Sequence, residues 1–239
     1  MNSELINKID VLPGWLSVHE GQFLYKAAQQ VRKTKGVMVE IGSFQGKSTI
    51  YMAKTKQKVF AIDPHQGRLD HGRKISPTLT AFNKNIKDFH VKNNVFLLKK
   101  TSKDAVSDWD KKIKLLFIDG LHDEKNAGFD YLNWSPFLVK GGIIAMHDSF
   151  CGWKGAQKVA INNIVLNDSY CEIGVVGSII YGVRGEGNLI SITNRFFKRS
   201  IILMAFWIYS KRSLPQWLSF IFIHRLLKLL LLNRYTLSR

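Results

Sequence analysis

The sequence has little of what marks several common classes of protein. Only 2 cysteines, Cys151 and Cys171, occur in 239 residues, so at most one disulfide can form and a disulfide-stapled scaffold is excluded. We expect both thiols to be reduced, in a protein that faces the cytosol. With 5 prolines and a hydrophobic fraction of 46%, the composition is that of a folded chain. No basic stretch followed by an apolar one opens the sequence, so we expect no secretory signal.

Acidic residues are missing from the end of the chain. No Asp or Glu follows Glu186, whereas nine Lys and Arg lie in 195–239, about half of the net charge of +17. The apolar stretches 201–209 and 214–223 both fall short of the roughly 18–20 residues that a membrane-spanning helix needs. Basic residues that alternate with Trp, Phe and Leu are typical of helices that lie in the membrane interface.

We therefore expect residues 195–239 to form a basic amphipathic helical tail that binds anionic lipid at a membrane surface. The alternative is a helix that covers the core or an interface of a homo-oligomer. Nucleic acid is not an expected partner, because apolar residues in the tail greatly outnumber the charges.

Residues 36–194 alternate apolar runs with helix-like stretches, which predicts an α/β domain with a largely parallel sheet. We expect strands at 36–42, 58–63, 94–99, 113–119, 142–147, 171–176 and 179–184. We expect helices at 46–55, 77–91, 102–109, 124–139 and 154–166, the fourth of them ended by Lys140-Gly141-Gly142. Residues 1–35 form a helical preface, with its best helix from Gly21 to Thr34.

A glycine-rich turn follows the first expected strand and opens a helix. It reads Val39-Glu40-Ile41-Gly42-Ser43-Phe44-Gln45-Gly46-Lys47-Ser48-Thr49, and such a turn brings backbone N–H groups close to a ligand. Asp63 ends the next strand, where a carboxylate can accept hydrogen bonds from ribose hydroxyls. Turn and acid together predict a cofactor that carries adenosine; the alternative is a structural turn beside a solvated acid. A P-loop is disfavoured, because that motif requires glycine where this chain has Ile41.

Two further carboxylates follow apolar strands. Asp119 and Asp148 should meet at the carboxyl edge of the sheet, where open α/β sheets bind ligands. Close carboxylates repel one another unless a proton or cation lies between them, and oxygen ligands suit Mg²⁺ or a similar divalent ion. His122, three residues beyond Asp119, is placed to remove a proton from a substrate hydroxyl whose pKa a metal has lowered.

The turn resembles motif I of the class I methyltransferases, which use S-adenosylmethionine. Asp119-Gly120-Leu121-His122 with His147-Asp148 resembles the metal and base motif of one branch. That branch contains metal-dependent sugar O-methyltransferases of macrolide biosynthesis and cephalosporin-tailoring enzymes. The resemblance covers about 36–150 and implies a Rossmann-like, doubly wound, mostly parallel sheet of seven strands. The implied order is 3-2-1-4-5-7-6, with the last strand antiparallel.

The resemblance also implies residue roles. The expected cofactor contacts are Glu40, Gly42 and Ser43 at the methionine part, Asp63 at the ribose, Thr101 and Ser102 near the adenine, and in addition Gly46, Ser48 and Asp119. The expected base is His122, and the expected metal ligands are Asp119, His147 and Asp148. The sugar-methylating relatives carry an acid where this chain has His147, so either a softer ion replaces Mg²⁺ or no metal is bound and His122 acts alone. The remaining alternative is that one or both histidines have no role in the reaction and only cap the ends of strands.

These inferences predict an O-methyltransferase that acts on a hydroxyl of a sugar, in a lipid-linked glycan or glycolipid, at the cytosolic face of a membrane. Two alternatives stay open: methylation of a small phenol or polyketide with the tail as an oligomer interface, and a non-catalytic membrane-bound scaffold. The polar stretch 64–76 is either a lid that faces an anionic substrate through Arg68, Arg73 and Lys74 or a solvated loop.

Overall fold

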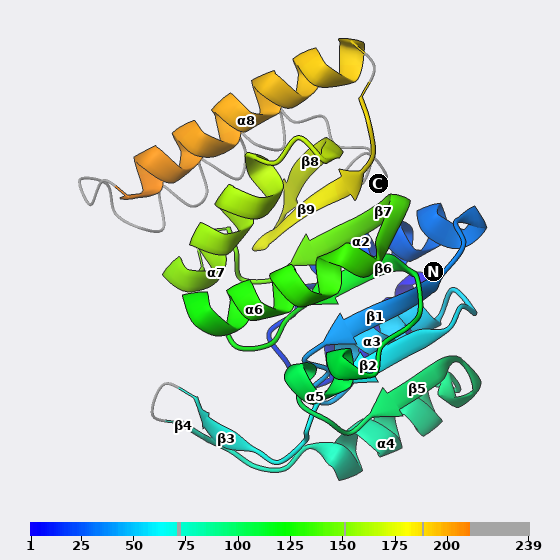
Figure 1. Ribbon diagram of the computed structural model, residues 1–239. Coiled ribbons are helices and arrows are strands. Elements are labelled where there is room, and N and C mark those ends of the chain that lie inside the picture. The colour runs from blue at the N-terminus through cyan, green and yellow to red at the C-terminus, as the bar shows by residue number, and fades with distance from the viewer. Residues whose placement is uncertain (71–72, 151, 188, 211–239) are drawn as a thin grey trace.

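The structure is a computed structural model that describes residues 1–70, 73–150, 152–187 and 189–210. A seven-stranded sheet lies at the centre, with helices on both faces (Figure 1). Its strands, in spatial order, are β5 (Val95–Leu98), β2 (Val59–Ile62), β1 (Val37–Ile41), β6 (Ile113–Ile118), β7 (Leu138–Met146), β9 (Ile179–Arg184) and β8 (Tyr170–Val176). Counted along the chain without the separate hairpin strands β3 and β4, this is the order 3-2-1-4-5-7-6, as predicted.

Strand direction also follows the prediction. β5, β2, β1, β6 and β7 run parallel, and β9 is antiparallel to both of its neighbours. All six residues of β6 are buried, because helices cover both faces of this central strand. The continuous apolar runs in the sequence therefore correspond to the parallel strands.

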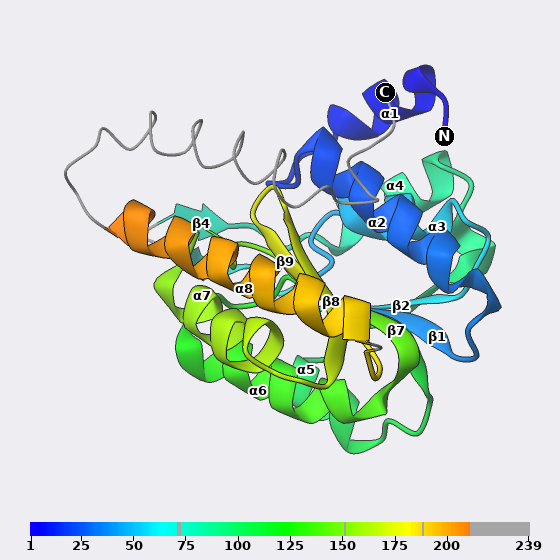
Figure 2. The same cartoon turned by 90° about the horizontal axis from the view of Figure 1, so that it is seen from above.

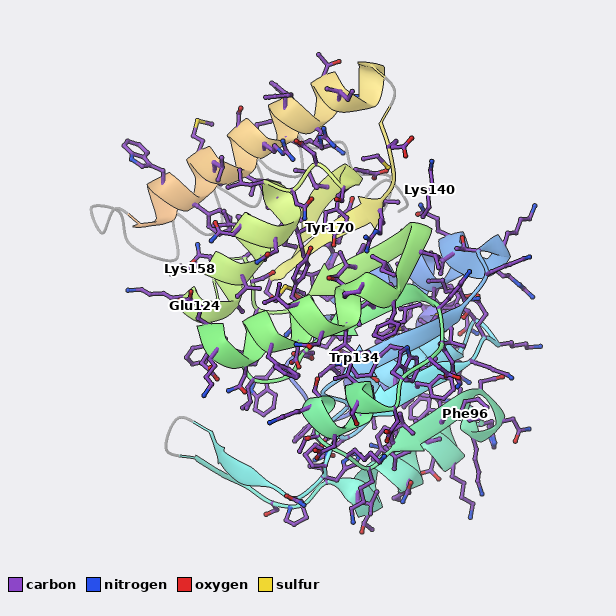
Figure 3. The ribbon with its side chains drawn as sticks, in the orientation of Figure 1. Phe96, Glu124, Trp134, Lys140, Lys158 and Tyr170 are labelled. Atoms are coloured by element: carbon purple, nitrogen blue, oxygen red, sulfur yellow. The ribbon has the colours of Figure 1, made fainter. Side chains whose placement is uncertain are left out.

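Two helical layers cover the sheet. One face carries α1 (Ser3–Asp10), α2 (Val18–Gln30), α3 (Lys47–Ala53) and α4 (Leu79–Asp88), and the other carries α5 (Ser102–Ser107), α6 (Glu124–Trp134), α7 (Lys154–Ala160) and α8 (Leu189–Ser210). Figure 2 shows α1 to α4 on one side of the sheet and α5 to α7 on the other. Each helical layer packs against its face of the sheet and encloses an apolar core there. Trp134 of α6 and Tyr170 of β8 are buried in the core under α5 to α8 (Figure 3).

The N-terminal preface is helical and tightly packed. α2 crosses α3 at Gly21, where a Cβ atom would lie 2.2 Å from the ring of Tyr51. A capping box between Ser17 and Glu20 begins α2. Three short 3₁₀ turns, Val31–Lys33, Lys92–Asn94 and Ser135–Phe137, and a π-helical turn, Ile161–Val165, complete the helical segments among the described residues.

α8 packs one side against the core and leaves the other in solvent. Its buried residues are Arg195, Ile201, Ile202, Ala205 and Phe206, and its exposed large apolar residues are Phe196, Phe197, Leu203, Met204 and Trp207. The helix begins at Leu189, so the predicted boundary after residue 194 falls inside it. The predicted apolar stretch 214–223 and the rest of 211–239 lie outside the described residues. None of the helices in the described part of the chain is long and apolar enough to cross a membrane.

The predicted helix 124–139 was too long. α6 ends at Trp134, a 3₁₀ turn carries Pro136, and β7 already begins at Leu138, four residues before the predicted strand. Pro136 has no N–H to continue the helical hydrogen bonds. Lys140-Gly141-Gly142 is therefore not a helix stop but an irregular part of β7, where the register against β6 shifts and Gly141 has a φ of +78°.

The stretch 64–76 is not only a loop. Arg68–Asp70 and Arg73–Ile75 pair as the antiparallel strands β3 and β4, and this hairpin projects at the edge where the parallel strands end (Figure 1). The side chains of Arg68, Arg73 and Lys74 lie outside the described structure, as does Cys151. The thiol of Cys171 is free.

Candidate active site

The residues that follow four neighbouring parallel strands lie in line at one edge of the sheet. Gly42, Asp63, Asp119 and His147 come directly after β1, β2, β6 and β7. The backbone N–H of each donates to the carbonyl of the last residue of the neighbouring strand, over 2.8 to 3.3 Å. The hydrogen-bonded ladder therefore extends one residue beyond the strands and fixes where these four side chains begin.

The glycine-rich turn depends on close backbone approach. Gly42 has a φ of +85°, and a Cβ atom there would lie 2.1 Å from the carbonyl oxygen of Asp119. Oδ2 of Asp63 accepts the backbone N–H groups of Ser43 (3.0 Å) and Phe44 (2.9 Å). The predicted ribose acid is thus attached to the predicted methionine-binding turn.

Glu40 is fully buried beneath this turn. Its carboxylate accepts the hydroxyls of Ser48 and Thr49. Burial raises the pKa of Glu40 to about 8, against the lowering effect of the two hydroxyls and with added repulsion from Asp119 and Asp63. Glu40 is therefore mostly protonated at neutral pH unless a cation lies beside it.

The two predicted histidines and two of the predicted acids converge. Nδ1 of His147 lies 3.0 Å from Oδ1 of Asp119 and 3.5 Å from Oδ2 of Asp148. Nε2 of His122 lies 3.3 Å from Oδ2 of Asp148 and 3.7 Å from Oδ1 of Asp119. His147 is buried, whereas the side chains of Asp119, His122 and Asp148 are 16 to 25% exposed. A substrate can therefore reach three of the four residues.

Charge in the cluster is strongly coupled. Burial opposes ionisation of His147, but Asp119, with Asp148 and Glu20, raises its pKa well above the ordinary value. Burial would likewise raise the pKa of Asp119, but His147 and His122 hold it below the usual range. Without another cation, His147 is the positive charge between the carboxylates.

The donor set fits a divalent metal. Candidate ligand atoms of Asp119, His122 and His147 all lie within 4.8 Å of one another. Nε2 of His122 and Nδ1 of His147 are buried and, among the described residues, have no hydrogen-bond partner of good geometry. Two nitrogens and the nearby carboxylate oxygens suit Mn²⁺, Fe²⁺ or Zn²⁺ better than an all-oxygen site would.

The loop of His122 is held by the start of α7. The N–H of Ala156 donates to the carbonyl of His122 over 2.9 Å, and Gly155 packs so closely that a Cβ atom would lie 2.5 Å from the same oxygen. The ring of Trp153 stacks on that of His122, with centroids 5.9 Å apart. Sequence reasoning missed Trp153, which lies beyond the motif-bearing segment.

Sequence reasoning also missed Glu20. Oε2 of this residue lies 3.6 Å from Nε2 of His147, on the side away from Asp119. The only signal in the sequence was Ser17-Val18-His19-Glu20, a capping-box pattern that predicts a helix start and not a site.

Thr101 and Ser102 begin α5 at the same edge. Thr101 caps the helix by accepting the N–H of Asp104. The hydroxyl of Ser102 donates to the buried Asp130 over 2.5 Å and accepts from the indole N–H of Trp134 over 2.8 Å. Their contact with adenine stays a prediction, as do the roles of Gly46, Ser48 and the other predicted site residues.

A hollow lies between α6 and α7. Its lining includes Gly128, Leu132, Val159 and the ion pair of Glu124 with Lys158, which are 2.7 Å apart (Figure 3). None of the predicted site residues lines it.

Comparison with known proteins agrees with the sheet order and the turn. Residues 39–149 match a family model described as a methyltransferase domain. The chain carries a methyltransferase domain. The matched segment runs from β1 to the residues after β7 and contains the turn, Asp63, Asp119, His122 and His147-Asp148.

Solved structures with the same fold include O-methyltransferases. The O-methyltransferase NovP is 15% identical, with a TM-score of 0.62, and the match covers 77% of this chain and 89% of that one. CalS11, a TDP-rhamnose 3'-O-methyltransferase of calicheamicin biosynthesis, is 18% identical, with a TM-score of 0.54 and coverage of 78% and 88%. An O-methyltransferase from Bacillus cereus in complex with SAH is 16% identical, with a TM-score of 0.53 and coverage of 76% and 88%. The predicted fold is confirmed, and the match of residues 39–149 confirms the predicted methyltransferase domain.

Proposed function

We propose that the methyltransferase domain transfers the methyl group of S-adenosylmethionine to a sugar hydroxyl, with His122 as the general base. The main observation is that the partly exposed side chain of His122 lies at the edge that also holds the glycine-rich turn, with its Nε2 3.3 Å from Oδ2 of Asp148. NovP and CalS11 are both O-methyltransferases, and the second acts on TDP-rhamnose. The likeness to them supports a hydroxyl oxygen as the methyl acceptor and a sugar as the molecule that carries it.

The residues divide the work of the reaction. Glu40, the turn from Gly42 to Gly46 and Asp63 hold the cofactor, so that its methyl group faces the cluster. His122 takes the proton of the attacking hydroxyl, and Asp148, beside its ring, stabilises the imidazolium that forms. Alignment of hydroxyl, methyl group and sulfur supplies much of the remaining acceleration. A divalent cation, held by Asp119, His147 and Asp148, would lower the pKa of the hydroxyl when bound.

Methyl transfer is tested by incubating the full chain with S-adenosylmethionine and a panel of acceptors. The panel contains nucleotide sugars, glycolipids and phenols, and S-adenosylhomocysteine formation is measured. We expect turnover with a sugar hydroxyl and a loss of about 100-fold or more in His122→Ala. His19→Ala, an exposed histidine on α2, serves as the matched control. Full activity in His122→Ala, or turnover only with phenols, would contradict the proposal.

We propose further that the enzyme works at the cytosolic face of a membrane, on a lipid-linked glycan or glycolipid. The support is α8, whose solvent side presents Phe196, Phe197 and Met204, 46 to 62% exposed, next to a basic C-terminal sequence. Apolar side chains beside Lys and Arg suit an anionic lipid surface.

Membrane binding is tested by flotation with liposomes of anionic or neutral lipid. We expect the full chain to float with anionic liposomes, and the triple variant Phe196→Ser, Phe197→Ser, Met204→Ser to float much less. Val11→Ser with Leu132→Ser, which removes two exposed apolar residues elsewhere, is the control. Failure of the full chain to float, with self-association in its place, would favour the oligomer interface.

A further inference from the structure

Glu20, on α2, is a buried carboxylate on the far side of His147 from the acid pair. It is 4% exposed, and its Oε2 lies 3.6 Å from Nε2 of His147, while Nδ1 of the same ring lies 3.0 Å from Asp119. The two ring nitrogens thus face carboxylates in opposite directions. Glu20 favours a proton on Nε2, which leaves Nδ1 directed at Asp119 and Asp148.

Glu20 also supports the turn that carries Asp148. Its Oε1 accepts the backbone N–H (2.6 Å) and the hydroxyl (2.8 Å) of Ser178, in the turn between β8 and β9. The hydroxyl oxygen of Ser178 accepts the N–H of Asp148 over 3.2 Å, and its carbonyl accepts those of the next two residues. Asp148 has a φ of +52°, uncommon for a residue other than glycine, so these bonds hold a conformation that the chain would otherwise rarely adopt.

The turn itself is shaped around this carboxylate. Gly177 has a φ of +61°, and a Cβ atom there would lie 2.4 Å from Oε1 of Glu20. Glu20 therefore touches the site from two sides, facing the ring of His147 and binding Ser178 beneath Asp148.

We propose that Glu20 is the positioning residue of a divalent-cation site formed by Nδ1 of His147 with the carboxylates of Asp119 and Asp148. Histidines that bind a metal commonly direct their other ring N–H at a carboxylate, which fixes the tautomer and the ring orientation. The nitrogen ligand favours Mn²⁺ over Mg²⁺. The inference rests on the proposed function, because the cation serves the hydroxyl that His122 deprotonates.

The inference is tested by titrating the full chain with Mn²⁺ alone and measuring free Mn²⁺ by electron paramagnetic resonance. We expect Glu20→Gln to lower Mn²⁺ affinity by about 10- to 100-fold. Glutamine keeps an acceptor oxygen for Ser178 and removes the charge that faces His147. It also replaces the oxygen that accepts the N–H and hydroxyl of Ser17, so the effect of that change on the fold needs the separate background described below. Glu4→Gln, an exposed glutamate on α1, is the control and should bind Mn²⁺ as the wild type does.

Calorimetry with S-adenosylmethionine separates this inference from the proposed function. Unchanged cofactor affinity in Glu20→Gln, together with weakened Mn²⁺ binding, supports a positioning role. Cofactor binding without any Mn²⁺ binding in the wild type overturns only this inference, whereas absence of cofactor binding overturns the proposed function.

Repeating the Glu20→Gln substitution in a second variant distinguishes positioning of the His147 ring from general support of the fold. In His147→Asp, the ligand at this position is a carboxylate with no ring nitrogen for Glu20 to face. Adding Glu20→Gln should then lower Mn²⁺ affinity by about threefold or less. Equal losses in the two backgrounds would mean that Glu20 only maintains the structure, and would overturn the proposal.

Discussion

At the scale of single residues, the site depends on carboxylates whose ionisation is set by their neighbours. Asp119 and His147 stabilise one another's charged forms, whereas Glu40 is buried against two hydroxyls and close to other acids. Sequence patterns found Asp119, His122 and Asp148 because each follows an apolar strand. They could not find Glu20, because its approach to His147 is created by the packing of α2 on the sheet.

Glu40 gives a prediction about pH. Its raised pKa of about 8 means that it is protonated at pH 7 in the free protein. If it receives the cationic methionine part of S-adenosylmethionine, that charge lowers its pKa and a proton is released on binding. Cofactor affinity should therefore rise with pH between about 6 and 8, by at most roughly tenfold per pH unit, and level off above.

The proton release is measured by calorimetry at pH 7 in two buffers of different ionisation enthalpy. Glu40→Gln cannot ionise, so its binding should show neither proton release nor this rise in affinity. If the affinity of the wild type for the cofactor does not depend on pH over the same range, Glu40 does not form an ion pair with the cofactor's positive charge.

At the scale of elements, apolar runs predicted the strands well and their boundaries less well. Both ends of β1, β2, β5 and β6 were predicted to within one residue, because buried parallel strands appear in the sequence as continuous apolar runs. The beginning of β7 was missed because Pro136 and the glycines at 141 and 142 look like the end of a helix. The hairpin of β3 and β4 was missed because each strand has only three residues, two of them charged, which is too short a stretch to show a pattern.

α8 gives a prediction about stability, because a helix that the sequence assigns to a tail contributes to the core. Ile202 is 0% exposed, whereas the adjacent Leu203 is 37% exposed. Ile202→Ala should lower the free energy of unfolding by about 2–5 kcal/mol, as buried Ile-to-Ala changes do. Leu203→Ala should change it by much less, with both values taken from urea unfolding.

The substitutions Ile202→Ala and Leu203→Ala also test whether the tail can be separated from the domain. If Ile202→Ala leaves the unfolding free energy unchanged, α8 does not support the core in solution. If it destabilises as expected, the proposed membrane-binding side of α8 has to be studied by substitution, because truncation before residue 195 would expose the core.

At the scale of the whole molecule, the site is assembled from segments far apart in the chain. α2 contributes Glu20, β1 and β2 bring the glycine-rich turn and Asp63, β6 and β7 bring the cluster, and the β8–β9 turn brings Ser178. Each segment reaches the site only when the sheet is complete. Ligand binding at this edge should therefore stabilise the entire fold and not a local part of it.

This coupling predicts a thermal shift. S-adenosylmethionine at about 100 times its dissociation constant should stabilise the folded state by about 2.7 kcal/mol, which for a chain of this size raises Tm by about 5–10 °C. Asp63→Ala removes the predicted ribose contact and the bonds to the turn, so its own Tm falls and its shift with the cofactor should largely disappear. Asp108→Ala removes an exposed carboxylate and should keep the full shift. The shift, not the absolute Tm, is the deciding quantity, because only the shift reports binding. A full shift in Asp63→Ala would mean that the cofactor does not lie where the edge of the sheet and the glycine-rich turn meet.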